Sequence, residues 1–518
     1  MDMQIAIIGS GLAGLTSAAF LVKEGYSVTV YEQHERIGGV TATIEKDGYK
    51  WDWGQMLVPD FGEGEPGRKI LEKLGISEEV RALKSYRENY FPDFRISRPK
   101  DFQGIYWRKE FFKELFPEDA KGLDKYYKIY NRIHDVSALL NKEGFLSKLK
   151  LFLTFLPIMK KKEWSAQKLM DYCFTNKKLQ AVFIAILADY VASPEVFPGL
   201  IIPTINAESQ YDERVPLDYG GHQHRQSWSY IENGMCTLVN ALAGFIEENG
   251  GKILTNTTID KIKLEDRSVK SVFLSYKEEV EVDLVIASGG AKELYLDLVG
   301  SEHLTQEFIK TYVDPLFTTE SVFMVHLGVD YDPSIYQNDA ALCYYYFTYD
   351  IGGSIKECQK GIYHEGNDGL LVYIPSKHSP EMAPPGHHAV TVYTIGPNIP
   401  INGSWKENKD DWADKLLDLT EKFIPGLREH AKTKIILTPE DFKKRTHLKH
   451  HAFGGTVPHL KVPPPQHKTP IKGLWFVGGQ SENFGGVVSA MVGAENAVKM
   501  LLKEAKTVMK QTFKSFSN

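Results

Sequence analysis

The chain has 518 residues, of which 42% are hydrophobic and 25% are charged. This balance is typical of a globular protein with a substantial core, and at roughly 150 residues per domain the length suggests about three domains. The 61 Lys and Arg residues against 67 Asp and Glu residues give a net charge of −6, which argues against a nucleic-acid-binding protein. The four cysteines are scattered without a C-x-x-C pair, so they predict neither a disulfide framework nor a zinc site.

Scattered free cysteines are typical of a reducing compartment. The beginning of the chain lacks the basic segment and cleavage site of a secretory signal, and no stretch reaches the roughly 18 apolar residues of a membrane-spanning helix. We therefore expect a cytoplasmic protein, with peripheral contact to the inner face of the membrane as an open alternative.

The first 32 residues have the pattern of a strand, a tight turn, a helix and a second strand. The turn is Gly9-Ser10-Gly11-Leu12-Ala13-Gly14. In this context the first glycine permits the turn, the second lets a pyrophosphate approach the backbone, and the third lets the helix pack closely on the strand. Glu32 ends the second strand about 20 residues on, where a carboxylate accepts the ribose hydroxyls. The pattern predicts a dinucleotide-binding site.

The residues that follow distinguish between dinucleotides. Glu32 is followed by Gln33 and Arg36, by the double glycine Gly38-Gly39 with Val40 and Thr41, and later by Gly54, Gln55 and Met56. Together with Leu15, Ala18 and Leu21, these motifs resemble the flavoproteins built on the glutathione-reductase-type FAD domain. The resemblance implies FAD rather than NAD. No second G-x-G-x-x-G follows a strand, so we expect electrons to pass to oxygen, a quinone or an external reductase.

Residues 473–498 and 229–266 narrow the resemblance to the phytoene desaturase, carotenoid isomerase and retinol saturase family. In that family Gly478, Gly479 and Gln480 would line the ribityl and pyrophosphate region. Gly486, Val487 and Val488 would open the last helix under the flavin ring, where the helix N-terminus stabilises negative charge on the reduced flavin. Thr258 and Ile259 would lie on the adenine side.

The resemblance implies an α/β fold with a glutathione-reductase-type, Rossmann-like FAD-binding domain. This domain is discontinuous and comprises residues 1–60, 226–300 and 446–503. Strand-like runs at 301–445 predict an inserted α+β substrate-binding sheet domain. Residues 61–225 are helix-rich and lysine-rich, and residues 504–518 are expected to form a fraying polar tail.

Two apolar segments each leave two interpretations open. Phe145–Lys162 places Phe145, Leu149, Phe152, Leu153 and Leu156 on one helical face bordered by lysines. It is either a core helix with a solvated edge or a monotopic membrane contact through which a lipid substrate enters. In the strand predicted around Tyr344, alternation places Tyr344 and Tyr346 on one face and Tyr345, Phe347 and Tyr349 on the other. Those tyrosines are either sheet packing or the wall of a substrate tunnel.

The sequence identifies no catalytic residue. Glu482 and the histidines His447, His450 and His451 are candidates only because they lie in the C-terminal region. Their spacing, with His459 further on, is not a standard set of metal ligands, and neither is His222 with His224, so no metal site is expected.

Three functions remain. The first is an FAD-dependent oxidoreductase acting on C–C or C=C bonds of an apolar polyene or isoprenoid, as a desaturase, saturase or isomerase. The second is a flavin amine or amino-acid oxidase, whose members commonly place an aromatic residue where this chain has Val487 and Val488. The third is a non-enzymatic prenyl-protein binder of the GDP-dissociation-inhibitor type, against which the intact glycine motifs argue.

Overall fold

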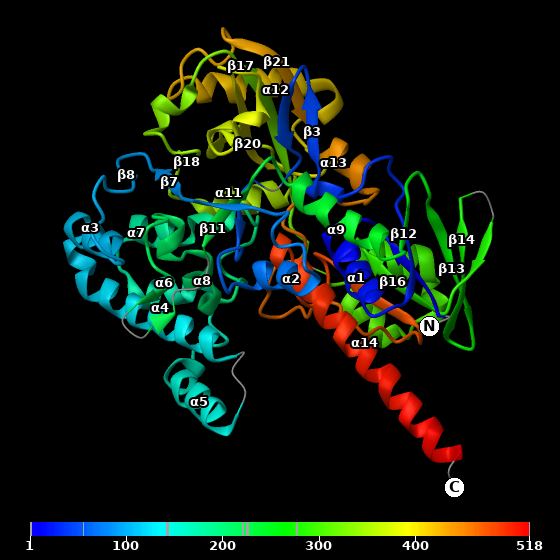
Figure 1. Ribbon diagram of the computed structural model, residues 1–518. Helices are drawn as coiled ribbons and strands as arrows, with labels where there is room; N and C mark the ends of the chain where they lie inside the picture. Colours follow the sequence, from blue (N-terminus) through cyan, green and yellow to red (C-terminus); the bar gives the residue numbers. More distant parts are fainter. Residues whose placement is uncertain are drawn as a thin grey trace.

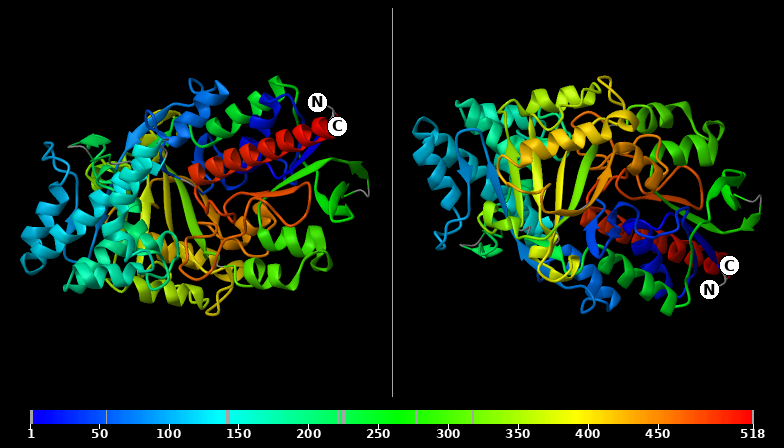
Figure 2. Two further views of the ribbon diagram at one scale, coloured as in Figure 1. Left: turned by 90° about the horizontal axis from the view of Figure 1, so that it is seen from below. Right: turned by 90° about the horizontal axis from the view of Figure 1, so that it is seen from above.

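The computed structural model describes residues 3–54, 56–140, 144–219, 222–223, 227–275, 278–316 and 318–516. Two large sheets lie at opposite ends of the molecule, with a group of helices beside the second sheet (Figure 1). The two further views show the long C-terminal helix running along the first of these ends (Figure 2). The site described below lies where the two ends meet.

The first sheet is built from segments that are far apart in the sequence. Its five parallel strands run in the order β12-β2-β1-β16-β22. Their bounds are β1 Gln4–Ile8, β2 Ser27–Tyr31, β12 Lys252–Leu254, β16 Leu284–Ser288 and β22 Leu474–Val477. The central strands are apolar along their length because both faces of the sheet are covered. The three sequence blocks therefore come together in one α/β unit.

Four helices cover one face of this sheet. They are α1 Leu12–Lys23, α2 Pro66–Leu74, α9 Cys236–Glu248 and α14 Val487–Phe516. Helix α1 packs against both α9 and α14, and its apolar residues are buried in the core that these helices share. Helix α14 includes most of the stretch 504–518 that the sequence analysis expects to be a fraying polar tail. It continues to Phe516 because residues 503–516 contain neither glycine nor proline to break the helix.

The other face of the parallel sheet carries an antiparallel sheet of three strands. These are β13 Ile259–Glu265, β14 Ser268–Leu274 and β15 Glu279–Glu281. Ile262 and Val272 face Val285 and Phe476 of the parallel sheet in a separate apolar core. A π-helical segment, Glu293–Gly300, closes the same core with Leu294 and Tyr295.

The second large sheet has seven strands in the order β21-β17-β20-β19-β18-β7-β8. Their bounds are β7 Arg87–Tyr90, β8 Arg95–Ile96, β17 Ser321–Val329, β18 Leu342–Tyr346, β19 Gly369–Tyr373, β20 His388–Gly396 and β21 Ala431–Leu437. Strands β17 to β21 lie in the stretch in which the sequence predicts an inserted sheet. Strands β7 and β8 come from the helix-rich stretch and pair beside β18, so that stretch contributes strands as well as helices.

The alternation predicted for the tyrosine-rich strand is confirmed up to Tyr346. Tyr344 and Tyr346 face the core that the sheet shares with the helices, and Tyr345 and Phe347 face the core under α12 (Trp405–Thr420). Tyr349 is the exception. Strand β18 ends at Tyr346, so the alternation no longer applies, and Tyr349 packs on the helical side.

The helices between β8 and the middle of the chain cover the Tyr344 face of the second sheet. They are α3 Trp107–Leu115, α4 Ala120–Leu140, α5 Phe145–Met159, α6 Ala166–Cys173, α7 Lys177–Ile184 and α8 Ile202–Ile205. Helix α5 packs on α4 and projects from the body of the molecule (Figure 1). No helix among the described residues is both long and apolar enough to cross a bilayer.

Short elements connect these layers. The small strands are β3 Thr43–Lys46, β4 Tyr49–Asp52, β5 Val58–Pro59, β6 Ala82–Ser85, β9 Asp218–Tyr219, β10 His222–Gln223 and β11 Trp228–Ile231. The remaining helices are α10 Gln306–Phe308, α11 Ile351–Gln359 and α13 Pro439–Thr446. Trp51 on β4 is buried and donates its Nε1–H to the carbonyl oxygen of Leu327 on β17, at 3.2 Å, which ties the N-terminal segment to the second sheet.

Candidate active site

A glycine-lined cavity of about 240 Å³ lies between the β1–α1 turn and the start of α14. We call it the glycine cavity. Fourteen of the residues proposed from the sequence line it: Gly9, Gly11, Leu12, Ala13, Glu32, Gln33, Gly38, Gly39, Val40, Thr41, Gly478, Gly479, Gly486 and Val487. These residues come from four separate stretches of the chain, and the fold brings them to one place.

The β1–α1 turn has the geometry that its three glycines predict. Gly9 has φ of +88°, which favours glycine, and its N–H donates to the Tyr31 carbonyl oxygen at 2.9 Å. A Cβ added to Gly14 would lie 2.0 Å from the Gly9 carbonyl oxygen, so helix and strand touch there. A Cβ added to Gly11 would meet no protein atom closer than the Ser288 Oγ at 3.7 Å. Packing of the protein therefore does not require glycine at position 11.

Glu32 is buried at the end of β2 and lines the glycine cavity. Its Oε2 accepts hydrogen bonds from the Ser10 N–H at 2.8 Å and the Ser10 hydroxyl at 2.5 Å, and its Oε1 accepts from the His34 N–H at 2.9 Å. A carboxylate has about four acceptor positions, so capacity remains for ligand hydroxyls. The carboxylate is held in place before any ligand arrives.

Arg445 is a site residue that the sequence analysis missed. It comes from α13, is 4% exposed and lines the glycine cavity. Its guanidinium donates to the carbonyl oxygens of Arg36, Ile37 and Gly39 at 2.8, 2.9 and 3.0 Å. Burial lowers the pKa of Arg445, while the neighbouring Glu32 carboxylate raises it. Arg445 therefore fixes the loop that carries the double glycine, although about 400 residues of sequence separate the two.

The structure places the other proposed residues outside the wall of the glycine cavity. Ser10 and Gly14 support the turn, as described above. The Gln480 side chain accepts from the Ala291 N–H at 2.9 Å, and the Arg36 side chain is 62% exposed beside Glu35. Thr258 and Ile259 lie at the start of β13, where the Thr258 carbonyl oxygen accepts from the Ser275 N–H. Gln55 and His224 lie outside the described residues.

A second group of glycines, of which the sequence analysis predicted only Gly479, joins the loop before β22 to the loop before α14. A Cβ on Gly485 would lie 1.6 Å from the Gly454 carbonyl oxygen, and a Cβ on Gly455 would lie 2.4 Å from the Gly479 carbonyl oxygen. The two backbones can approach this closely only without side chains. The sequence signal was the Gly454-Gly455 pair after Phe453, which no motif covered.

A second cavity, of about 310 Å³, adjoins this glycine group, and we call it the apolar cavity. Its wall and that of the glycine cavity share Phe453, Gly454, Gly485, Gly486 and Val487. The rest of its wall is mainly aliphatic and aromatic: Met56, Leu57, Pro59, Ile186, Tyr190, Phe197, Ile201, Ile205, Trp228, Leu342, Tyr344, Tyr393, Pro458, Phe484 and Val488. Of the residues proposed from the sequence, Gly54, Met56 and Val488 line this cavity.

Six polar side chains interrupt the apolar wall: Asp60, Asp189, Thr204, Gln210, Asn483 and Ser489. Asp189 is one of the two carboxylates among them and accepts from the hydroxyls of Tyr344 at 2.7 Å and Tyr393 at 3.3 Å. Burial raises the pKa of Asp189 to about 6, although the Tyr344 hydroxyl, the Arg87 charge and the Tyr393 hydroxyl lower it. Tyr344 packs in the sheet core and also lines this cavity.

The C-terminal candidates for catalysis do not line either cavity. The Oε1 of Glu482 accepts from the His467 N–H, and the ring of His450 contacts the Thr319 carbonyl oxygen. His451 is buried with its Nδ1 at 2.7 Å from the Ser321 hydroxyl, and burial lowers its pKa to about 3. His447 caps the C-terminus of α13. Within the described ranges, no three His, Cys, Asp or Glu side chains gather as metal ligands would.

Comparison with known proteins gives three consistent results. The sequence profile of the flavin-containing amine oxidoreductases matches residues 12–501. The chain is 27% identical over 98% of its length to the 4,4'-diaponeurosporene oxygenase of Staphylococcus aureus, of which it covers 99%. It also superposes on an oxidoreductase from Methanosarcina mazei with a TM-score of 0.62 at 18% identity, covering 96% of this chain and 100% of that one. It superposes on the structure of wild-type putrescine oxidase bound to putrescine with a TM-score of 0.61 at 15% identity. That superposition covers 97% of this chain and 99% of the putrescine oxidase chain.

The residues of the glycine cavity fit FAD. Glycines from five loops line the cavity, its Glu32 carboxylate has acceptor capacity left for a ribose, and the first turn of α14 contributes Val487 to its wall. Backbone without side chains is what lets a pyrophosphate and a ribityl chain approach closely. The match across residues 12–501 and this cavity together establish that the chain belongs to the family of flavin-containing amine oxidoreductases, as an FAD-dependent oxidoreductase.

Proposed function

We propose that this oxidoreductase acts on carbon–hydrogen and carbon–carbon double bonds of an apolar polyene or isoprenoid lipid. The observation that carries the proposal is the apolar cavity. It adjoins the glycine cavity through Gly485, Gly486 and Val487, and most of its lining side chains are aliphatic or aromatic. The relative that is 27% identical over nearly its whole length is named for the oxygenation of a carotenoid, 4,4'-diaponeurosporene. Desaturation, saturation, isomerisation and oxygenation all start from such a substrate at the flavin.

The chain's own residues provide three conditions for that chemistry. The apolar wall excludes water from the substrate and strengthens electrostatic interactions inside the cavity. The N-terminus of α14 lies at the junction of the two cavities, where its dipole stabilises negative charge. Val487 and Val488 give the substrate an aliphatic surface to pack against. FAD, when bound, supplies the capacity to accept or return two electrons.

An amine oxidase is the competing assignment, and two observations bear on it. The family includes enzymes of that type, since putrescine oxidase has the same fold. The apolar cavity also contains two carboxylates, Asp60 and Asp189, that would pair with an amine cation. The lack of an aromatic residue at Val487 and Val488, and the identity of the sequence relative, favour the polyene.

We further propose that helix α5 contacts a membrane. Its apolar side chains remain outside the core, with Phe145 79% exposed, Leu146 78%, Phe152 54% and Leu153 57%. The lysines Lys148, Lys150, Lys160 and Lys162 are exposed on or just after the same helix. An exposed apolar face bordered by lysines suits the headgroup region of a membrane that contains anionic lipids. A substrate that partitions into lipid would then reach the protein at this helix.

The domain organisation proposed from the sequence stays a proposal with one adjustment. We assign residues 1–60, 226–300 and 446–503 to the FAD-binding unit, because they provide the parallel sheet and its covering layers except for α2. Residues 301–445 provide most of the second sheet. We assign β7 and β8 to the sheet unit rather than to the helical part of residues 61–225, because they pair with β18.

The experiment that tests the proposed substrate class is mass spectrometry of apolar molecules extracted from the purified protein, with its absorption spectrum recorded beside it. We expect flavin absorption together with a co-purified polyene or isoprenoid that is absent from a control protein purified in parallel. A protein that retains a small amine and no apolar molecule would support the amine oxidase instead.

A further inference from the structure

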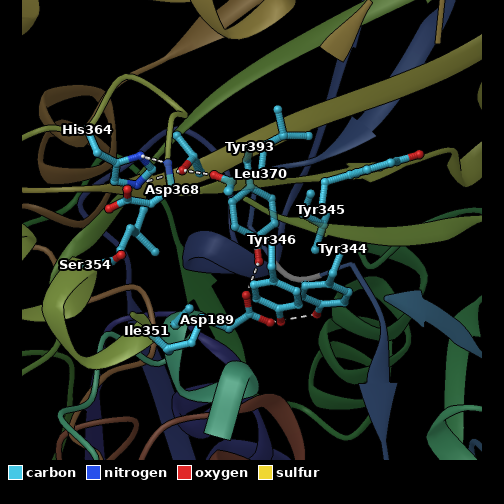
Figure 3. Close-up of a pocket in the computed structure, with 15 residues that line it drawn as sticks. Asp189, Tyr344, Tyr345, Tyr346, Ile351, Ser354, His364, Asp368, Leu370 and Tyr393 are labelled. Atoms are coloured by element: carbon cyan, nitrogen blue, oxygen red, sulfur yellow. Dashed lines mark hydrogen bonds between the residues drawn. The ribbon is translucent and has the colours of Figure 1, made fainter. Parts of the chain in front are cut away.

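The apolar cavity contains one carboxylate that two tyrosines hold in position. Asp189 is contributed by the segment that follows α7, Tyr344 by β18 and Tyr393 by β20. Each tyrosine hydroxyl donates to a different oxygen of the carboxylate, Tyr344 to Oδ2 at 2.7 Å and Tyr393 to Oδ1 at 3.3 Å (Figure 3). All three residues line the apolar cavity, whose wall also includes Val487 and Val488 at the flavin end. The carboxylate is therefore presented, in a fixed orientation, to whatever occupies the cavity.

A small chamber of about 50 Å³ lies on the other side of the same three residues. Asp189, Tyr344 and Tyr393 line both this chamber and the apolar cavity. The chamber also borders His364, Asp368, Ser354 and Tyr346 (Figure 3). The buried Tyr346 hydroxyl has no hydrogen-bond partner among the described residues, and the volume suffices for a few water molecules at most. The wall of this chamber is mainly apolar, and Asp189 contributes to the walls of both cavities.

We propose that Asp189 exchanges the proton that accompanies oxidation of the substrate in the apolar cavity. The assignment rests on the proposed function and names the acid–base group of that same site. It also replaces Glu482 and the histidines at 447–451, which line neither cavity.

The proton follows from the balance of the reaction. Oxidation of a CH–CH unit to a double bond removes one hydride, which FAD accepts, and one proton. The second C–H bond breaks, its electron pair becomes the new π bond, and an O–H bond forms on Asp189. If oxygen enters the product instead, water supplies it, and the proton that Asp189 accepts comes from that water. In the saturating direction Asp189 returns the proton to carbon.

The surroundings of Asp189 suit this exchange near neutral pH. Burial raises its pKa to about 6, and the opposing causes are the Tyr344 hydroxyl, the Arg87 guanidinium and the Tyr393 hydroxyl. The other titratable groups that face the carboxylate or the chamber behind it are Tyr190, Tyr346, His364 and Asp368. A pKa close to the working pH lets one carboxyl group both accept and release a proton.

Arg87 assists without touching the carboxylate. It is 1% exposed on β7, stacks 5.5 Å from the centre of the Tyr344 ring and donates to the Tyr211 hydroxyl at 3.1 Å. Its charge favours the ionised form of Asp189. Arg87 is thus a positioning residue that tunes the proton acceptor.

The test compares Asp189→Asn with two matched carboxylate variants. Asp60→Asn removes the other carboxylate of the apolar cavity, and Asp171→Asn removes an exposed one on α6. Flavin reduction by a polyene is followed anaerobically in a single turnover between pH 5 and 9. We expect the wild-type rate to rise with pH through about 6, where Asp189 ionises, and Asp189→Asn to be slower by about 100-fold or more. We expect Asp171→Asn to match wild type.

A second readout does not depend on turnover. Infrared spectra of the oxidised, substrate-free protein should show a protonated buried carboxyl group that appears as the pH falls through about 6. This band should be missing in Asp189→Asn and should move to higher pH in Tyr344→Phe, because the hydroxyl that stabilises the ionised form is gone. Flavin content should be unchanged in every variant.

The outcomes separate this assignment from the proposed function. A wild type reduced by a polyene, with Asp189→Asn equally fast at every pH, would overturn the role of Asp189 and leave the proposed function standing. Loss of the rate in Asp60→Asn alone would also overturn it. A wild type that no polyene reduces or reoxidises would refute the proposed function and this assignment with it.

Discussion

Replacing Arg445 should weaken FAD binding even though its guanidinium donates three hydrogen bonds to backbone carbonyl oxygens of the protein. The guanidinium is buried and donates to three carbonyl oxygens of residues 36–39, the loop that carries Gly38 and Gly39 into the wall of the FAD cavity. Arg445→Met keeps much of the side-chain volume and removes all three hydrogen bonds. The loop then has to be ordered by the cofactor rather than by the protein.

The size of the effect follows from those three contacts. At about 1 kcal/mol of net stabilisation for each hydrogen bond, they contribute about 3 kcal/mol. Because about 1.4 kcal/mol corresponds to a tenfold change in an equilibrium constant, the Kd for FAD should rise about 100-fold. Arg445→Lys keeps the charge but loses the planar, forked geometry, so its Kd should lie between those of wild type and Arg445→Met.

The assay is titration of the apo-protein with FAD, followed by quenching of flavin fluorescence. Lys444→Met is the matched control, since it removes a positive charge from the exposed neighbouring position of α13. Circular dichroism and thermal unfolding of each apo-protein separate lost binding from lost folding. Equal FAD affinity in Arg445→Met, Lys444→Met and wild type would refute the reasoning.

Three further predictions concern the cofactor turn, helix α5 and a buried carboxyl group. Gly11→Val should fold normally and lose FAD. Gly14→Ala should lower the melting temperature of the apo-protein, because its Cβ would lie 2.0 Å from the Gly9 carbonyl oxygen. Equal melting temperatures of the two variants would contradict this prediction. Replacing Phe152, Leu153 and Leu156 by Ser should abolish salt-sensitive co-sedimentation with anionic liposomes, while the flavin content stays constant. A wild-type protein that never co-sediments would refute the membrane contact. Burial raises the pKa of Asp52 to about 7, so the folded state holds this proton more tightly than the unfolded one, and the stability that this provides is lost as the pH rises from about 4 to 7. Asp52→Asn should remove that loss, which is on the order of 4 kcal/mol in the free energy of unfolding at pH 8. Its amide oxygen can still accept from the Met235 N–H and the Thr43 hydroxyl. An unchanged pH profile in urea denaturation would contradict this prediction.

The sequence carried most of the information for the FAD cavity. Gly9, Gly11 and Gly14 occupy one short turn, and both the order of strand, turn and helix and the position of Glu32 follow from local chemistry. The strands at 321–329 and 388–396 lie in the stretch where the sequence predicts a sheet, and both are rich in the apolar and β-branched residues that favour strands.

What the sequence could not reveal is contact between distant segments. Arg445 reaches residues 36–39 because α13 packs beside residues 39–41, and Gly485 packs on Gly454 because the chain around β22 returns to the first sheet. Nothing in the pattern around Asp189 marked it as the carboxylate of the apolar cavity, since its partners Tyr344 and Tyr393 lie on strands that pair through the fold. The end of α14 was misplaced for a simpler reason, because polar residues continue a helix when neither glycine nor proline interrupts it.

The central claim is that the flavin of this protein exchanges electrons with an apolar polyene. It is tested most directly by mixing the FAD-loaded protein anaerobically with carotenoid precursors and recording the absorbance of the oxidised flavin. Amines and amino acids are tested in the same way. In a parallel series the flavin is chemically reduced before the polyene is added. Our account predicts bleaching by a polyene, or conversion of a polyene by the reduced protein, and no response to amines. Rapid bleaching by an amine, with no response to any polyene in either redox state, would contradict it.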